Sequence, residues 1–224
     1  MHGHHLSVDT QRWSETFVAG HDRRRRQITS KLDALGLGRI PKTAAVLDLC
    51  CGACESLDAL YELGFRDLTG MDLQPLDDVL ANPRYAVVAG DVESPPFEPA
   101  SKDWILILHA LHHLEGPEKI GRVLDRAYAL LRPGGRLSII DFPNTPLLRL
   151  AFRLFRVPPL LITPYLRYYG GLVQEEWPYL KEYLPQFKQV EARLENGQFE
   201  VESKRRSLFL FFLTLRKPVS GPAV

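Results

Sequence analysis

Short, nearly continuous apolar runs alternate with segments that carry apolar residues at helical spacing over residues 41–141. Runs of four to six such residues are typical of strands that are buried on both faces of a parallel sheet. The pattern predicts strands at residues 44–49, 68–71, 85–89, 104–108 and 137–140, and helices at residues 54–63 and 120–131. This β-α-β-α alternation indicates a doubly wound α/β sheet.

The segments on either side of this core have other patterns. Residues 8–35 are predicted to be one helix, and the basic run 23–26 is interpreted as a solvated helix face, with a binding patch as the alternative. The predicted apolar face of that helix contains Trp13, Phe17, Ile28, Leu32 and Leu35.

After the core, Pro133-Gly134-Gly135 is expected to form a turn that ends a helix before the strand at 137–140. Residues 172–190 predict one or two helices interrupted by Pro178 and Pro185. Residues 199–203 and 208–215 predict an antiparallel hairpin at the sheet edge, connected through Lys204-Arg205-Arg206.

Length and composition are those of one globular α/β domain of 224 residues. We expect an N-terminal helical cap at 1–40 and a ligand-binding domain at 41–224. The 28 basic and 27 acidic residues nearly balance, so the net charge does not indicate binding to nucleic acid. A small molecule is the expected partner. Three cysteines within five residues, no signal-peptide pattern and no apolar run of about 18 residues favour a cytoplasmic protein.

The turn after the first predicted strand reads Asp48-Leu49-Cys50-Cys51-Gly52-Ala53-Cys54. In open α/β sheets, ligands bind beyond the carboxyl ends of the strands, where small residues let the backbone approach them. Gly52 is such a residue, and Asp72 follows 20 residues later, at the spacing of an acid that reaches ribose hydroxyls. The sequence therefore predicts a nucleoside-containing ligand at this edge.

Several segments resemble, in the same order, the motifs of class I S-adenosylmethionine (SAM)-dependent methyltransferases. The resemblance covers about residues 40–142 and is carried by Val46 to Gly52, Gly70-Met71-Asp72, Gly90-Asp91-Val92-Glu93 and Leu131 to Leu137. It implies a Rossmann-like, mostly parallel seven-stranded sheet in which the C-terminal hairpin supplies the reversed strand, with a helical cap. It also implies SAM as the cofactor.

The resemblance assigns roles by position. Asp48, Cys50, Cys51 and Gly52 would shape the pocket for the methionine half of SAM, and Asp72 would accept hydrogen bonds from the ribose. Leu73 is a further predicted cofactor-binding residue. Asp91 would accept from the adenine amine, with Val92 beside the ring. His109, after the fourth strand, would face the methyl group and act as the catalytic residue. Cys50 and Cys54 stand where the family has glycine, and a side chain at 54 would intrude where backbone and ligand meet.

Metal binding is the alternative for two of these clusters. Cys51 and Cys54 form a C-x-x-C pair, but no second pair completes a zinc site, and buried packing is the preferred interpretation over metal or redox chemistry. His112 and His113 are interpreted as packing or capping residues, because no carboxylate pattern accompanies them. No metal site is predicted. Asp103 and Asp141 are interpreted as loop caps, although Asp141 is close enough to the sheet edge to touch substrate.

We therefore expect a SAM-dependent methyltransferase that acts on an O, N or C atom of a small, apolar or lipid-like acceptor. An insertion at about 146–190 would form a lid, and its apolar, basic part at 146–169 is expected to cover the acceptor or, alternatively, to contact an anionic membrane peripherally. The layout is loosely similar to ubiquinone/menaquinone C-methyltransferases and small phospholipid N-methyltransferases. The alternatives are a SAM-binding cyclase or regulatory protein and a nicotinamide oxidoreductase; Asp48 and the Pro-Gly-Gly turn favour the methyltransferase.

Overall fold

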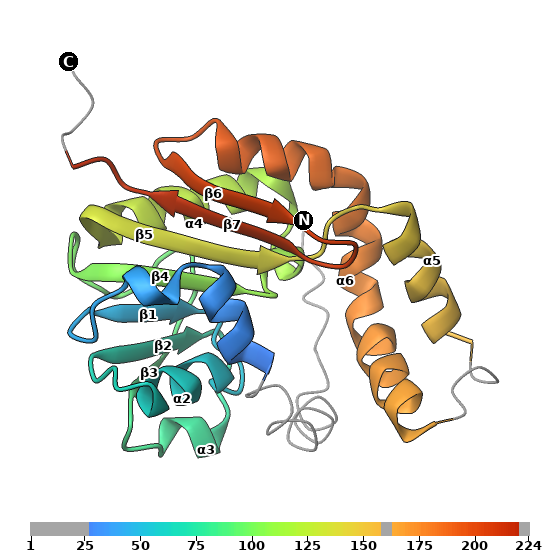
Figure 1. Cartoon of the computed structure of the whole chain (residues 1–224), viewed down its shortest axis with the longest axis horizontal. Helices are drawn as coiled ribbons and strands as arrows, with labels where there is room; N and C mark the ends of the chain where they lie inside the picture. The colour runs from blue at the N-terminus through green and yellow to red at the C-terminus, as the bar shows by residue number, and fades with distance from the viewer. Residues whose placement is uncertain (1–26, 158–162, 220–224) are drawn as a thin grey trace, which may run out of the picture.

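The computed structural model describes residues 27–157 and 163–219. Within these ranges seven strands form one sheet in the order β3-β2-β1-β4-β5-β7-β6 (Figure 1). They are β1 (Val46–Leu49), β2 (Leu68–Asp72), β3 (Ala86–Ala89), β4 (Lys102–Leu108), β5 (Leu131–Asp141), β6 (Glu200–Arg206) and β7 (Phe211–Arg216). Neighbours among β1 to β5 are parallel, whereas β7 is antiparallel to both β5 and β6. The predicted doubly wound, seven-stranded Rossmann-like fold is confirmed.

Helices cover both faces of this sheet (Figure 1). They are residues 27–34, η1 (Leu37–Arg39), α2 (Glu55–Glu62), α3 (Asp77–Leu80), η2 (Leu111–His113), α4 (Gly116–Leu130), α5 (Pro146–Phe155) and α6 (Pro164–Glu195). The single turn of α3 was not predicted, because four residues are too few to show a helical period. The part of the predicted N-terminal helix before residue 27, with Trp13, Phe17 and the basic run 23–26, lies outside the described residues.

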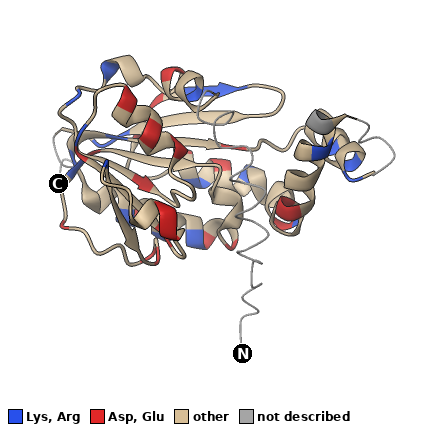
Figure 2. Ribbon diagram, turned by 90° about the horizontal axis from the view of Figure 1, so that it is seen from below, with Lys and Arg blue, Asp and Glu red and all other residues tan. Residues whose placement is uncertain are grey.

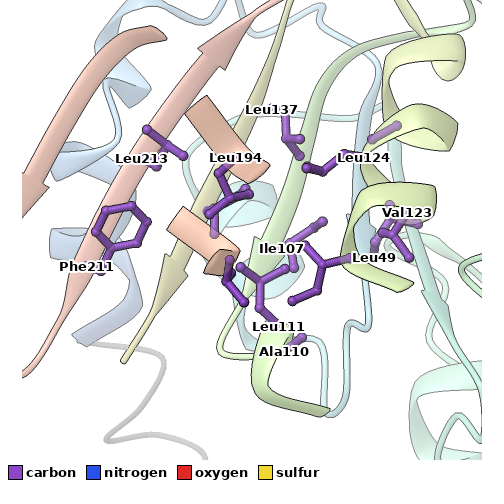
Figure 3. Packing of buried hydrophobic residues seen from close by; sticks show 14 of the residues in the cluster. Leu49, Ile107, Ala110, Leu111, Val123, Leu124, Leu137, Leu194, Phe211 and Leu213 are labelled. Atoms are coloured by element: carbon purple, nitrogen blue, oxygen red, sulfur yellow. The ribbon is translucent and has the colours of Figure 1, made fainter. Parts of the chain in front are cut away.

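The core has two layers because successive side chains of each strand point to opposite faces. Trp104 and Leu106 of β4 pack with α2 and the helix at 27–34, whereas Ile105 and Ile107 pack toward α4 and α6. Figure 3 shows Ile107 beside Leu111 and Ala110 within the second layer. Both layers lie beneath the carboxyl ends of the parallel strands, so they hold that edge rigidly.

The structure corrects three predicted connections. Residues 133–135 form no separate turn, because β5 runs from Leu131 to Asp141 and its register against β4 shifts at this point. Residues 204–206 belong to β6 and do not connect the hairpin. Pro178 and Pro185 do not break the helix, because α6 continues through both as a single helix of 32 residues.

Two helices of the predicted lid start with the same signal. Thr145 and Thr163 each cap a helix by accepting, at 3.1 Å, the backbone N–H three residues on, and each is followed by proline at the first helical position. α5 and the first half of α6 project away from the sheet (Figure 1). In Figure 2 both signs of charge are interspersed over the sheet domain, and the projecting helices carry basic as well as acidic segments. No helix among the described residues is long and apolar enough to cross a membrane.

Candidate functional site at the carboxyl edge of the sheet

The turn between β1 and α2 has an unusual backbone. Cys50, Gly52 and Cys54 all have positive φ values, of 64°, 52° and 59°. The turn is held in place by the N–H of Cys51, which donates to Met71 O of the neighbouring strand at 3.0 Å. Left-handed backbone at non-glycine residues costs roughly 1–2 kcal/mol each and concentrates at ligand sites. Such a backbone is compatible with the close approach of a ligand that the sequence predicts.

The Cys54 side chain does not lie on the outer surface of this turn. It is fully buried in the core between α2 and the helix at 27–34, with its Sγ 3.4 Å from Cys51 Sγ. Cys51 in turn packs against Gly70, where an added Cβ would lie 2.8 Å from the Cys51 Sγ. Both thiols fill space in the core, and the expected intrusion of Cys54 into the pocket is wrong.

Three carboxylates surround the turn. Asp72, at the end of β2, accepts the Gly52 N–H at 2.9 Å through Oδ2 and the Gln74 N–H at 3.2 Å through Oδ1. Asp91, after β3, accepts the Glu93 N–H at 2.9 Å. Burial, reinforced by the charges of Asp72, Asp48 and Asp91, raises the pKa of the Cys50 thiol above its usual range. The three predicted acids thus meet at one edge, around a neutral thiol.

Asp48 differs from the other two acids because it is almost completely buried. Its Oδ2 accepts a hydrogen bond from the Ser56 hydroxyl, while Oδ1 is buried and has no hydrogen-bond partner among the described residues. Burial raises the pKa of Asp48 to about 7, although the Ser56 hydrogen bond opposes the shift. A buried carboxyl oxygen without a partner is rare and is expected where a ligand completes the bonding.

His109 follows β4 at the same edge, with a positive φ of 56° and its N–H bonded to Ile140 O at 2.7 Å. Its Nε2 lies 2.8 Å from the Lys31 ammonium, and its ring centroid lies 5.5 Å from that of Phe142. Burial and the Lys31 charge lower the pKa of His109 to about 3. The ring is neutral, and its Nε2 lone pair accepts from Lys31. This geometry supports a positioning role for His109 more than proton removal.

A second cluster, formed by His112, His113, Asp141 and Glu176, lies beside His109. His112 is buried, and its Nδ1 lies 2.8 Å from Asp141 Oδ1. The backbone N–H of His112 donates to Asp141 Oδ2 at 3.2 Å, and the Phe142 N–H donates to Oδ1 at 2.7 Å. Glu176 Oε2 of α6 lies 3.1 Å from His112 Nε2 and 3.2 Å from His113 Nε2. We call this the histidine–carboxylate cluster.

The charges in this cluster are strongly coupled. Burial alone would lower the pKa of His112, but the Asp141 charge and the bonds to Asp141 and Glu176 outweigh it and raise the pKa to about 10. Burial would likewise raise the pKa of Glu176, but the bonds from His112 and His113 hold it below its usual range. Asp141 is therefore more than a loop cap, and carboxylates do accompany the two histidines. The sequence interpretation missed this because Glu176 lies 64 residues from His112 in the chain.

Comparison with known proteins agrees with this geometry. Residues 47–139 match the family profile described as "Methyltransferase domain". Demethylmenaquinone methyltransferase of Listeria monocytogenes is 30% identical over 152 residues, which are 59% of this chain and 62% of that protein. The 2-phytyl-1,4-naphtoquinone methyltransferase of Thermosynechococcus vestitus is 28% identical over 156 residues, 64% of this chain and 67% of that one. Residues 47–139 of the chain are therefore similar to methyltransferase domains.

The similarity of fold extends beyond the matched segment. The crystal structure of magnesium protoporphyrin IX methyltransferase from Synechocystis PCC 6803 with bound SAH superposes with a TM-score of 0.60 at 18% identity, over 94% of this chain and 95% of that one. The chain spans less than two thirds of the length of the Listeria relative. Its own activity and acceptor are therefore argued from the site.

The remaining predicted cofactor residues lie at the same edge. Leu73 follows Asp72 directly and is 61% exposed, so it presents an apolar surface beside the acid. Val92 follows Asp91 and is buried in the layer that includes Leu49 and Met71. The structure thus gathers the predicted residues from the turns after β1, β2, β3 and β4. Lys31, Ser56 and Glu176 were not predicted, since none belongs to a motif.

Proposed function

We propose that this chain binds SAM at the carboxyl ends of β1 to β4 and catalyses methyl transfer to an O, N or C atom of a small, apolar acceptor. The observation that carries the proposal is the convergence of Asp48, Asp72 and Asp91 on the strained turn at Cys50 to Cys54, inside a methyltransferase domain.

The hydrogen-bond acceptors at this edge match the donor groups of SAM. Asp72 would accept from the ribose hydroxyls, because an ionised carboxylate can accept more bonds than the two it makes to backbone N–H groups. Asp91 would accept from the adenine amine, with Leu73 and Val92 against the ring. The unpartnered Asp48 Oδ1 is available to the methionine half, beside Cys50, Cys51 and Gly52. When bound, SAM supplies an activated methyl group.

The protein's own contribution is alignment and exclusion of water. His109 is fixed by Lys31 at Nε2 and lies beside the Phe142 ring, so it forms a neutral wall where β4 ends. α6 covers this region through Glu176. These contacts fix the side chains that would face the acceptor.

The acceptor class is supported by two observations. The two relatives described above are named for naphthoquinone-type acceptors. In addition, α5 exposes Leu147, Leu150 and Leu154 beside Arg149 and Arg153, a pattern suited to an anionic lipid surface. We propose that residues 146–169 form a lid over an apolar acceptor and also contact membranes peripherally, with the protein itself cytoplasmic.

Calorimetry with SAM, S-adenosylhomocysteine and NAD tests the cofactor assignment. We expect both SAM and S-adenosylhomocysteine to bind, and Asp72→Ala to lose at least the roughly 1.5–3 kcal/mol of a charge-assisted hydrogen bond. Asp78→Ala, which removes an exposed carboxylate from the short helix α3, serves as the control and should bind SAM normally. Binding of NAD without SAM would overturn the proposal.

Methyl transfer itself is tested with radiolabelled SAM and a panel of demethylated naphthoquinones, phenols and amines in detergent micelles. We expect label in the organic phase from the unaltered protein and less from Asp72→Ala. Tight SAM binding with no transfer to any quinone, phenol or amine in the panel would favour the non-transferring alternative, a cyclase or a regulatory SAM-binding protein.

A further inference from the structure

Three ligand atoms of the histidine–carboxylate cluster lie together beneath α6. They are His112 Nε2, His113 Nε2 and one carboxylate oxygen of Glu176, and all three lie within 4.8 Å of one another. The two nitrogens are 3.1 and 3.2 Å from the same Glu176 oxygen. Two imidazoles and one carboxylate are a ligand set used by protein metal sites that keep an open position.

The separations fit a shared ion. Zinc binds imidazole nitrogen at about 2.0–2.1 Å and carboxylate oxygen at about 2.0–2.2 Å, so two such ligands at a tetrahedral angle lie roughly 3.3 Å apart. The two observed nitrogen–oxygen separations are within a few tenths of an ångström of this value. The two nitrogens lie within 4.8 Å of each other, so all three ligand atoms are close enough to reach one ion.

The surroundings of His112 also match those of a metal ligand. A metal-bound histidine typically donates its other ring N–H to a carboxylate, which fixes the ring and its tautomer. Asp141 occupies that position at 2.8 Å from Nδ1, and it is itself held by the backbone N–H groups of His112 and Phe142. The Asp141 side chain is fully buried, so its contacts are with the protein interior and not with solvent.

The cluster is closed on one side and open on the other. The His112 side chain is 1% exposed, whereas those of Glu176 and His113 are 16% and 34% exposed. An ion could therefore enter from the His113 side, and a ligand from solution could reach its remaining coordination position. The Phe142 ring lies between the cluster and His109. Its centroid is 5.3 Å from that of His112 and 5.5 Å from that of His109.

We propose that His112, His113 and Glu176 bind a divalent transition-metal ion of the Zn²⁺ class, positioned by Asp141. The ion would replace the proton between His112 Nε2 and Glu176, and that proton would be released to solvent. Nitrogen ligands favour such ions over Mg²⁺ and Ca²⁺, which prefer oxygen throughout. The open coordination position would bind an oxygen atom of the methyl acceptor. This role in acceptor binding rests on the proposed methyltransferase function. Metal binding itself does not depend on that function.

The cysteines of the first turn do not compete for this ion. Cys51 and Cys54 are buried in the core with their sulfur atoms 3.4 Å apart, and among the described residues no second cysteine pair completes a site around them. A cobalt spectrum separates the two sites, because thiolate ligands add intense charge-transfer bands that nitrogen and oxygen ligands lack.

The test uses the full chain, stripped with a chelator, and titrated with Zn²⁺ and Co²⁺ in the absence of SAM. We expect one equivalent of each ion to bind with micromolar affinity or better, and a tetrahedral or five-coordinate Co²⁺ spectrum without thiolate bands. Glu176→Gln and His113→Asn should each weaken binding at least tenfold, in keeping with loss of a ligand. Glu182→Gln, on an exposed position of the same helix, is the matched control and should bind normally.

Binding weaker than about 100 µM, a thiolate spectrum, or equal affinity in the control and Glu176→Gln would each overturn the site. Circular dichroism and SAM calorimetry on every variant show whether it is folded. A chain that binds SAM but no metal refutes only this inference, whereas a chain that binds metal but not SAM refutes only the proposed function.

Discussion

Replacing Asp48 by asparagine removes an ionisable group from the buried end of β1. The pKa of this carboxyl is raised from 3.8 to about 7 by burial. An acid whose pKa is raised on folding stabilises the fold below its ordinary value, and that contribution is lost as the pH rises through the folded value. The unaltered protein should therefore lose stability between about pH 4 and about pH 7.

The magnitude follows from the shift. One pKa unit corresponds to about 1.4 kcal/mol, so a shift of about three units gives at most about 4 kcal/mol, of which about 3 kcal/mol falls between about pH 5 and pH 8. The asparagine side chain in Asp48→Asn does not titrate, and its carbonyl can still accept from Ser56. Its amide would replace the unpartnered Oδ1 with a buried donor, which costs roughly 1–3 kcal/mol at every pH.

The assay is urea unfolding of the unaltered protein and of Asp48→Asn at several pH values between about 5 and 8.5. We expect the difference in free energy of unfolding, variant minus unaltered protein, to increase with pH and then level off. Asp77→Asn, at an exposed position of α3, controls for loss of one negative charge. Parallel stability curves for Asp48→Asn and the unaltered protein would show that Asp48 is ionised in the fold and that the argument from burial is wrong.

Three further changes are predicted. His109→Gln should keep SAM affinity and lower kcat. The pH–rate profile between about pH 6 and 9 should keep both of its limbs, because the ring is already neutral there. Loss of a limb would assign proton removal to His109. Gly70→Ala places a Cβ 2.8 Å from Cys51 Sγ and should cost about 1–3 kcal/mol in thermal unfolding, partly recovered by adding Cys51→Ala; no recovery would contradict the contact. Leu150→Glu should reduce cosedimentation with anionic phosphatidylglycerol vesicles about tenfold, whereas the control Leu63→Glu, on the sheet domain, should not. Equal binding by both variants would refute the lipid-facing role of α5.

The strands of the core were predictable because both of their faces are buried. β4 needs apolar side chains toward α2 and toward α4, so Trp104 to Leu108 reads as an unbroken apolar run. The turn at Gly52 and the acid at Asp72 were also predictable, because the chemistry of a nucleoside site requires small residues and a carboxylate at that spacing.

Other features depend on contacts that a local pattern does not record. The prolines of α6 predict a break, but packing on α4 and η2 keeps the helix continuous through Pro178 and Pro185. The sequence predicts a catalytic base at His109, because the contact of its Nε2 with Lys31, 78 residues earlier, leaves no local pattern. The histidine–carboxylate cluster needs Glu176, whose own surroundings in the chain are those of an ordinary amphipathic helix.

The position of β7 between β5 and β6 affects how the chain acquires its fold. β5 ends at Asp141, but its second neighbour arrives only with residues 211–216. During synthesis β5 is therefore an open edge, with Ile139 and Ile140 flanking unpaired backbone groups, while about 70 more residues are made. Long-range antiparallel pairing of this kind is slow, so the nascent chain is most exposed to aggregation after β5 and before β7. A chaperone that covers β5, or a shorter insertion between β5 and β7, would reduce this exposure to aggregation.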